Sequence, residues 1–227
     1  MIGLPRLYAI LDAGYFPDAD AMYSAAENLA SAGCTLIQYR NKSGNGRVML
    51  EHARELRRLF RGTEGQDSHF SQDRGEVGHP TVKLIMNDRA DLCLAADFDG
   101  VHVGQDDLSP EAVRKIIGWG TQGDARWLGV STHNPEQVRE ADQTSADYIA
   151  IGPVFATSSK ENPDPVVGLE GVRRARELTR KPLVAIGGIT RANARSVIDA
   201  GADSIAVISD LLRDPRKSAE EFLRILG

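Results

Sequence analysis

Residues 82–108 read VKLIMNDRADLCLAADFDGVHVGQDDL, and this stretch predicts the fold of the chain. Residues 82–86 and 100–103 are short apolar runs with β-branched side chains, as in buried strands, and residues 91–96 between them predict a short helix. A polar cluster follows each strand, NDR after the first and QDD after the second. The strands of a βαβ unit are parallel, so we expect both clusters at one edge of the sheet.

The carboxylates of these clusters predict a metal site. Carboxylates gathered at one edge of a sheet repel one another, and a bound cation removes that repulsion. Hard oxygen ligands suit Mg²⁺. We therefore expect a Mg²⁺ site built from Asp88 and one of Asp106 or Asp107. The alternative, which NDR and QDD favour when taken alone, is that these residues cap helices or are solvated acids of loops.

Composition limits the class of protein. With 227 residues, 41% of them hydrophobic, the chain can form one sizeable core, and we expect a single domain over residues 1–227. A net charge of -5 argues against binding to nucleic acid or to an anionic membrane, but it permits a local basic pocket for phosphate. We expect small-molecule partners, and the composition is compatible with a homo-oligomer.

The cysteines and the N-terminus favour a cytoplasmic protein. Cys34 and Cys93 are far apart in apolar contexts, which is typical of buried thiols in a reducing compartment. The N-terminus has no basic leader segment, and it enters a predicted strand almost at once. No apolar run is long enough to cross a bilayer.

Strands and helices alternate roughly eight times along the chain. The strands are continuous apolar runs, as expected when both faces of a parallel sheet are covered, and this count predicts a TIM (β/α)8 barrel. A doubly wound open sheet is the alternative, but it usually has five or six strands, and no G-x-G-x-x-G follows the first strand. Residues 61–80 are polar, lack periodicity and predict a surface insertion. The predicted strands cover residues 7–11, 35–39, 82–86, 100–103, 127–130, 148–151, 183–186 and 204–208, and the closing helix covers residues 219–226.

In such a barrel the active site forms at the C-terminal ends of the strands. Gln38, Arg40 and Lys42 share one side of an extended chain after the second strand, so three polar groups point together. Further polar residues follow the other strands: Asn87, Asp88, Gln105, Asp106, Asp107, Ser131, His133, Thr157, Ser158, Ser159, Lys160 and Ser209. Cations, carboxylates and hydroxyls together suit a phosphorylated ligand bound with a metal.

The last two strands predict a phosphate site. Gly187 and Gly188 follow the seventh strand in the sequence IGGI, and GADSIAVIS covers the eighth. Backbone N–H groups in these two turns form the usual phosphate cup of a barrel. The alternative is that the glycine pair forms only a tight turn. One phosphate in this cup and a diphosphate near Arg40 and Lys42 would place two anionic substrates together, which indicates group transfer.

Several motifs in order resemble the thiamine-phosphate synthase family. The resemblance covers the chain from end to end except the insertion. The motifs are QYRNK at residues 38–42, NDRAD at 87–91, GVHVGQDDL at 100–108, LGVSTH at 128–133, ADYIAIGPVFATSSK at 146–160, GLEG at 168–171, AIGGI at 185–189 and GADSIAVIS at 201–209.

This resemblance implies a magnesium-dependent transferase of thiamine biosynthesis. The family joins 4-amino-2-methyl-5-(diphosphooxymethyl)pyrimidine to 4-methyl-5-(2-phosphooxyethyl)thiazole, giving thiamine phosphate and pyrophosphate. Carried onto this chain, Asp88 and Asp107 bind Mg²⁺, which selects Asp107 over Asp106. The implied pyrimidine diphosphate residues are Gln38, Tyr39, Arg40, Asn41, Lys42, Asn87, Ser131 and Lys160, with Arg40, Lys42, Lys160 and Ser131 as the catalytic set. The implied thiazole phosphate residues are Thr157, Ser158, Ser159, Gly188, Ile208 and Ser209.

The chain departs from the family pattern at three positions. Ala156 replaces a usual proline, Ser159 a usual threonine and Tyr39 a usual leucine. A hydroxyl is kept at Ser159, and the side chain of Tyr39 is expected to point away from Gln38. His102 lies within a strand and is expected to be structural. Rival readings are a related barrel that isomerises thiazole phosphate or acts as a regulator, a non-catalytic binding module for thiamine precursors, and a phosphate-binding barrel of unknown substrate.

Overall fold

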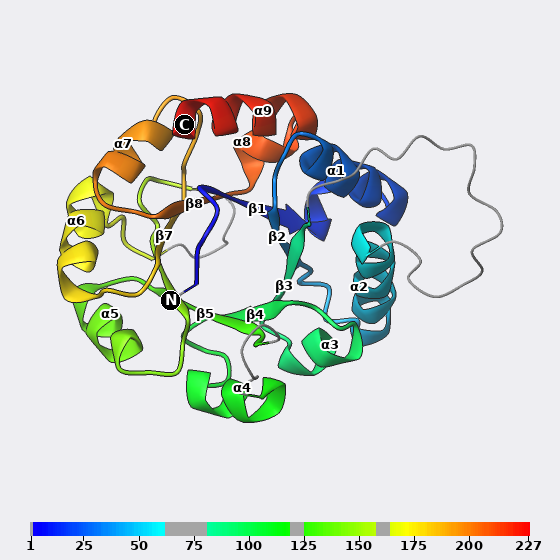
Figure 1. Ribbon diagram of the computed structural model, residues 1–227, viewed down its shortest axis with the longest axis horizontal. Coiled ribbons are helices and arrows are strands. Elements are labelled where there is room, and N and C mark those ends of the chain that lie inside the picture. The colour runs from blue at the N-terminus through cyan, green and yellow to red at the C-terminus, as the bar shows by residue number, and fades with distance from the viewer. Residues whose placement is uncertain (1, 62–80, 119–124, 158–163) are drawn as a thin grey trace.

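The structure is a computed structural model that describes residues 2–61, 81–118, 125–157 and 164–227, and these residues form a closed barrel of eight parallel strands (Figure 1). Each strand pairs with its neighbours in sequence, and β1 also pairs with β8 to close the ring. The predicted TIM barrel is therefore confirmed. The strands are β1 (Leu7–Asp12), β2 (Leu36–Arg40), β3 (Lys83–Asn87), β4 (Gly100–Val103), β5 (Trp127–Thr132), β6 (Tyr148–Ile151), β7 (Leu183–Ile186) and β8 (Ser204–Val207).

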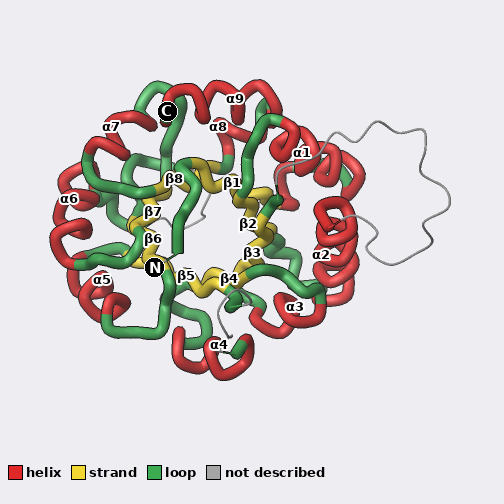
Figure 2. The backbone as a smooth tube through the Cα atoms, viewed as in Figure 1, coloured by secondary structure: helices red, strands yellow, loops and turns green. Residues whose placement is uncertain are grey.

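The helices surround the strands as an outer layer (Figure 2). A short 3-10 helix, η1 (Ala13–Tyr15), follows β1 before the first α-helix. The α-helices are α1 (Ala19–Ser31), α2 (Gly46–Arg61), α3 (Ala90–Ala95), α4 (Pro110–Ile117), α5 (Pro135–Asp142), α6 (Gly168–Leu178), α7 (Ala194–Asp199), α8 (Ser209–Leu212) and α9 (Pro215–Leu226). Among the described residues, none of these helices has both the length and the apolar content to cross a bilayer.

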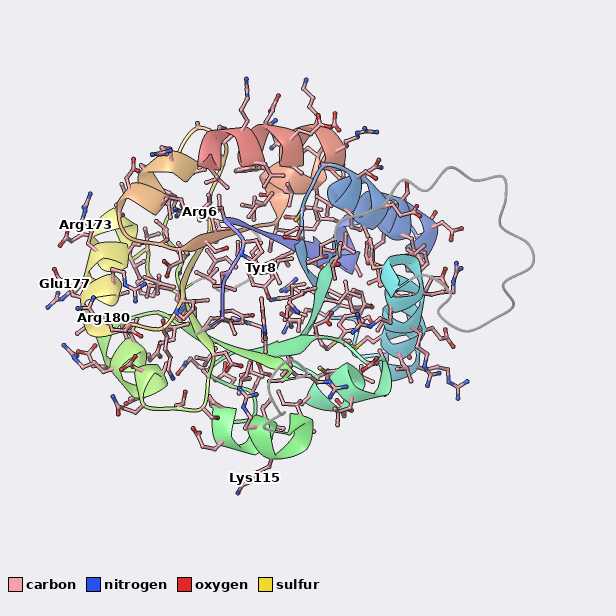
Figure 3. All side chains as sticks on the ribbon, viewed as in Figure 1. Arg6, Tyr8, Lys115, Arg173, Glu177 and Arg180 are labelled. Carbon is pink, nitrogen blue, oxygen red and sulfur yellow. The ribbon has the colours of Figure 1, made fainter. Side chains whose placement is uncertain are left out.

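The alternation of side chains along each strand produces two separate cores. An inner cluster fills the barrel and includes Tyr8, Leu36, Ile85 and Val184, while a larger outer cluster lies between the strands and the helices. In Figure 3, Tyr8 lies within the ring of strands, whereas Lys115 points outward from α4. The barrel interior is thus packed with side chains, which leaves the two ends of the barrel for ligands.

The C-terminal region differs from the prediction in two places. The turn expected after the eighth strand forms a short helix, α8, which begins at Ser209. The closing helix begins at Pro215 instead of residue 219, because Asp214 caps it and a proline is favoured in the first helical turn. The insertion expected at residues 61–80 lies, apart from Arg61 at the end of α2, outside the described residues.

Side-chain caps begin several of the helices and fix where the chain turns back. Asp18 accepts a hydrogen bond from the backbone N–H of Ala21 at 2.9 Å, and Ser109, Asn134 and Asp214 each accept a comparable bond three residues ahead. Each cap satisfies an N–H group that has no partner inside its helix. The caps therefore hold the loops between strands and helices at defined lengths.

Replacing the cap of α1 will lower stability through one lost hydrogen bond. We expect Asp18→Ala to lower the free energy of unfolding by about 1 kcal/mol, measured by urea denaturation. Asp18→Asn keeps the accepting oxygen and serves as the matched control, with a loss of a few tenths of a kcal/mol at most. Equal losses in the two variants would show that charge, not capping, is the important contribution.

Candidate functional site

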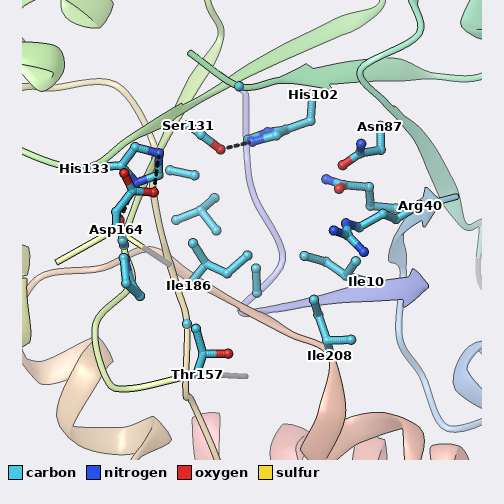
Figure 4. Close-up of a pocket in the computed structure, with 18 of the residues that line it drawn as sticks. Ile10, Arg40, Asn87, His102, Ser131, His133, Thr157, Asp164, Ile186 and Ile208 are labelled. Carbon is cyan, nitrogen blue, oxygen red and sulfur yellow. Dashed lines mark hydrogen bonds and ion pairs between the residues drawn. The ribbon is translucent and has the colours of Figure 1, made fainter. Parts of the chain in front are cut away.

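A cavity of about 690 Å³ opens at the C-terminal ends of the strands, where the sequence predicts the active site. All eight strands contribute lining residues, from Tyr8 on β1 to Ala206 on β8. Figure 4 shows Arg40 and Asn87 on one side of this cavity, with Thr157 and Ile208 at another. The predicted polar residues that the structure describes are therefore brought together around one cavity.

Strand β2 directs its polar side chains into the cavity as the two-residue period predicts. Gln38, Arg40 and Lys42 all line it. The guanidinium of Arg40 forms an ion pair with Asp12, a buried residue at the end of β1. Because a buried carboxylate holds it, Arg40 is kept in one orientation at the mouth.

Tyr39 and Asn41 face the other way. The hydroxyl of Tyr39 lies 3.0 Å from Nδ1 of His52 on α2 and accepts a hydrogen bond from Asn41 Nδ2 at 3.0 Å. The ring of Tyr39 is fully buried in the outer core. The structure therefore places these two residues between the barrel and its helices, away from the cavity, because successive side chains of a strand point to opposite faces.

The two aspartates expected to bind a metal both line the cavity. Asp88 follows β3 with a φ of +63°, a left-handed conformation that few residues other than glycine, asparagine and aspartate adopt. Its carboxylate lies 2.6 Å from the Nζ of Lys42. Asp107 accepts a hydrogen bond from the backbone N–H of Gly104 at 2.7 Å. Asp106 also lines the cavity mouth and, like Asp107, is exposed.

Partial burial raises the pKa of Asp107, and the neighbouring Asp88 carboxylate raises that pKa further. The Gly104 N–H and the Lys42 ammonium act in the opposite direction. A carboxylate whose charge is disfavoured by a second carboxylate beside it fits a site for a divalent cation. In the part of the chain that the structure describes, no group of three or more His, Cys, Asp or Glu residues is arranged to hold a metal ion. A pair of carboxylates fits Mg²⁺, which keeps several waters or substrate phosphates as ligands.

Ser131 and His102 form another part of the cavity wall (Figure 4). The Ser131 hydroxyl lies 2.9 Å from His102 Nε2, and the Ser131 backbone oxygen accepts a bond from Gln105 Nε2 at 2.6 Å. Burial lowers the pKa of His102 to about 4, although Asp107 opposes that shift. His102 is therefore neutral at pH 7, and it contacts a cavity residue as well as packing in the barrel.

His133 lies at the mouth beside the loop after β6. Its Nδ1 lies 2.6 Å from the backbone oxygen of Gly152, an acceptor that fixes a proton on this nitrogen. Its Nε2 lies 3.4 Å from the Asp164 carboxylate (Figure 4). Both residues line the cavity. His133 therefore shapes the mouth by joining two loops.

The turns after β7 and β8 form the wall of the cavity that lies across the barrel from β3 and β4. Gly187 and Gly188 have φ values of +100° and +62°. A Cβ on Gly188 would approach the Ala156 backbone oxygen to 2.5 Å, so the turn packs closely against the loop after β6. Ile208 and Ser209 face this turn from the start of α8, and all four residues line the cavity.

Arg191 links these two turns. Its guanidinium bonds to the Asp210 carboxylate on α8 at 3.1 Å and to the Glu221 carboxylate on α9 at 2.5 Å. Asn193 donates a hydrogen bond to the backbone oxygen of Gly188 at 3.1 Å. The two carboxylates raise the pKa of Arg191 above its ordinary value, so the link keeps its charge at every physiological pH. These bonds therefore fix the two turns to α8 and α9.

The chain matches known proteins over almost its whole length. The family model described as thiamine monophosphate synthase matches residues 7–211. A thiamine-phosphate synthase of Koribacter versatilis is 56% identical over 98% of this chain and 96% of that protein. The chain belongs to the thiamine-phosphate synthase family. A thiamine-phosphate synthase of Chloroflexus aurantiacus is 40% identical, covering 97% of this chain and 92% of that protein.

A solved structure agrees with this assignment. The thiamine phosphate pyrophosphorylase of Pyrococcus furiosus has a TM-score of 0.77 to this chain at 32% identity. The match covers 97% of this chain and 95% of that one. Membership of the thiamine-phosphate synthase family thus rests on sequence and fold together.

Three residues that the resemblance assigns to substrates, Ser158, Ser159 and Lys160, lie outside the described residues. Thr157, just before them, lines the cavity.

Sequence reasoning did not assign a site role to Asp12, Tyr8 or Tyr148. Asp12 had a visible signal, because it is an acidic residue at the end of a predicted strand. Tyr8 and Tyr148 lie inside strands that read as apolar runs, and only the closed barrel shows that their hydroxyl groups meet.

The neutral state of His102 predicts a loss of stability in acid. Its pKa in the folded protein, about 4, lies below the ordinary value of 6.5, so the unfolded chain binds the proton more tightly. Stability falls as pH falls from about 6.5 towards 4, and His102 adds no pH dependence above that range. We expect it to account for about 3 kcal/mol of unfolding free energy lost between pH 7 and pH 4.

Urea denaturation at pH 7, 5.5 and 4 measures this loss. The His102→Gln variant lacks the titrating ring and serves as the reference. A loss in acid that is the same in the variant as in the native chain would contradict the assignment to His102.

Proposed function

We propose that the cavity of this barrel joins the pyrimidine diphosphate to the thiazole phosphate of thiamine biosynthesis, with Mg²⁺ as cofactor. The observation that carries this proposal is that two groups of residues suited to anions line the same cavity. Arg40 and Lys42 line it at the end of β2, and the turn of Gly187 and Gly188 lines it together with Ser209 after β7 and β8. In a member of the thiamine-phosphate synthase family, these regions suit the diphosphate of one substrate and the phosphate of the other.

The pyrimidine diphosphate lies, in this proposal, along β2 and the ends of β3 to β5. Gln38, Asn87 and Ser131 face the ring, while Arg40 and Lys42 face the diphosphate. Arg40 is already oriented by Asp12 and so loses little freedom when it binds phosphate. Lys42, now paired with the Asp88 carboxylate, is a long side chain that can turn to the diphosphate. Lys160 joins this set by family resemblance alone.

Asp88 and Asp107, which both line the cavity, would hold Mg²⁺. An ion held there would supply positive charge that offsets the negative charge on the leaving group. The carbon–oxygen bond breaks with its electron pair leaving on pyrophosphate, and the amino group of the pyrimidine stabilises the carbinyl cation that remains. The lone pair of the thiazole nitrogen forms the new carbon–nitrogen bond, so no side chain has to remove a proton.

The chain's own residues therefore act through position and charge. Arg40 and Lys42 stabilise charge that builds up on the departing diphosphate. The glycine turn after β7 and Ser209 hold the thiazole phosphate, so its nitrogen faces the pyrimidine carbon. Neither His102 nor His133 is needed as a base. The charged, water-soluble substrates and the two free, buried cysteines support a cytoplasmic location for this reaction.

Pyrophosphate release tests the metal assignment. With both substrates present, we expect release that requires Mg²⁺ and stops with EDTA. Asp88→Ala and Asp107→Ala should each lower kcat/KM by about a hundredfold or more, because charge on the leaving group is no longer offset. Asp106→Ala, which removes the adjacent exposed carboxylate, is the matched control and should keep most of the activity. Full activity in the Asp88→Ala, Asp107→Ala double variant would disprove the metal site.

The glycine turn predicts a separate effect on the second substrate. We expect Gly188→Ala to raise the KM for thiazole phosphate about tenfold or more, because the added Cβ meets the Ala156 oxygen and moves the turn. Gly118→Ala is the matched control. Gly118 has a similar φ of +79° at the end of α4, and no atom of the residues that the structure describes lies within 4 Å of its added Cβ. If both variants raise that KM equally, loss of stability and not the turn is the cause.

A further inference from the structure

A chain of buried hydrogen bonds crosses the barrel beneath the cavity. Gln38 Nε2 donates to the Tyr8 hydroxyl at 2.8 Å, and the Tyr8 and Tyr148 hydroxyls lie 2.9 Å apart. The Tyr148 hydroxyl lies 3.1 Å from His102 Nδ1, and His102 Nε2 lies 2.9 Å from the Ser131 hydroxyl. The chain thus begins and ends at residues that line the cavity, on β2 and on β5.

The middle of this chain is tightly built. Tyr8 is 1% exposed, Tyr148 0% and Gln38 3%. The rings of Tyr8 and Tyr148 meet edge to face with centroids 6.1 Å apart. Gly129 lies where Tyr148 and His102 cross, and a Cβ at that position would overlap both side chains. Tyr8 and His102 are among the described residues that line the cavity, whereas Tyr148 is not. Tyr148 can therefore affect a bound ligand only through these two neighbours.

In this chain of hydrogen bonds, the donor-to-acceptor direction of one bond sets the direction of the next, because each hydroxyl group and the imidazole ring carry a single proton. A hydroxyl group donates one hydrogen bond, and neutral His102 has one N–H, so one ring nitrogen donates and the other accepts. With Gln38 donating to Tyr8, one arrangement gives every proton inside the chain an acceptor. In it Tyr8 donates to Tyr148, Tyr148 to His102 Nδ1, and His102 Nε2 to Ser131. The Ser131 proton then points to the cavity, and Gln38 keeps its oxygen as an acceptor.

We propose that Tyr148 and His102 are positioning residues that couple Gln38 to Ser131 and so select an aminopyrimidine ring. This inference rests on the proposed function, because it specifies how that site recognises one substrate. An aminopyrimidine carries a donating amino group and accepting ring nitrogens. These match an accepting Gln38 oxygen and a donating Ser131 hydroxyl.

The coupling between Gln38 and Ser131 also explains why the site would reject an oxopyrimidine ring. The corresponding oxopyrimidine has a carbonyl in place of the amino group and an N–H in place of one ring nitrogen, so its donors and acceptors are exchanged. Binding it would require Gln38 and Ser131 to reverse together, and every link between them would reverse as well. A buried group left without a partner is costly, so the intact chain opposes that reversal. If one of these hydrogen bonds is removed, Gln38 and Ser131 can change orientation independently of each other.

The Tyr148→Phe variant removes one link while keeping the ring. The measured quantity is the ratio of dissociation constants for the oxopyrimidine and aminopyrimidine monophosphates, obtained by calorimetry because neither has a diphosphate to lose. We expect this ratio to fall about tenfold or more, with weaker binding of the amino compound. The KM for thiazole phosphate should stay within about twofold, since that substrate contacts the opposite wall.

Thr132→Val is the matched control for this variant. Thr132 is fully buried beside Ser131, and its hydroxyl donates to the Ala150 backbone oxygen at 2.8 Å, outside the chain. Its loss should leave the ratio unchanged. Tyr8→Phe breaks the preceding link and should repeat the effect, which keeps the test available if Tyr148→Phe does not fold.

A third comparison separates positioning from general loosening. In a Ser131→Ala background, Tyr148→Phe should add little further loss of aminopyrimidine binding, because the residue it positions is gone. An unchanged ratio in Tyr148→Phe, or a parallel rise in the thiazole phosphate KM, would overturn the proposal. Failure of the proposed function is seen separately, as absence of pyrophosphate release from the native chain with both substrates and Mg²⁺.

Discussion

The closure of eight parallel strands into one ring is the constraint on which the site depends. Parallel strands share one polarity, so every loop that follows a strand emerges at the same end of the barrel. Asp88 and Asp107, which follow β3 and β4, meet there, and Lys42 from the end of β2 offsets part of their repulsion. An open sheet would align neighbouring loops but would not bring the turn after β7 opposite β2.

Continuous apolar strands predicted a parallel sheet covered on both faces, and the count of roughly eight strands predicted its closure into a barrel. The sequence also predicted most of the polar residues that line the cavity, because a polar residue directly after a buried strand must lie at the C-terminal end of the barrel. The two-residue period separates Gln38 and Arg40 from Tyr39 and Asn41 in the same way. A family resemblance that treats residues 38–42 as one motif does not make that separation.

The buried chain beneath the cavity was not predictable in the same way. The Tyr8 and Tyr148 hydroxyls meet across 140 residues of sequence, and nothing local in either strand indicates a partner. Their contact is a property of the closed interior, where a polar atom without a partner is costly and the side chains therefore settle into one arrangement. Helix α9 shows a local failure of a different kind: apolar periodicity located its body, whereas its start depends on the cap at Asp214.

His102 connects the two functional halves of the wall formed by β3 to β5. Its backbone oxygen accepts a bond from the Asp88 N–H at 2.8 Å, which supports the left-handed conformation of Asp88. Its ring belongs to the buried chain that ends at Ser131. Strain of this sort persists only where neighbouring structure fixes it, and here the pairing of β3 with β4 does so. The backbone of Asp88 and the hydroxyl of Ser131 are therefore both held by His102, so this one residue links the proposed metal site to the proposed pyrimidine site.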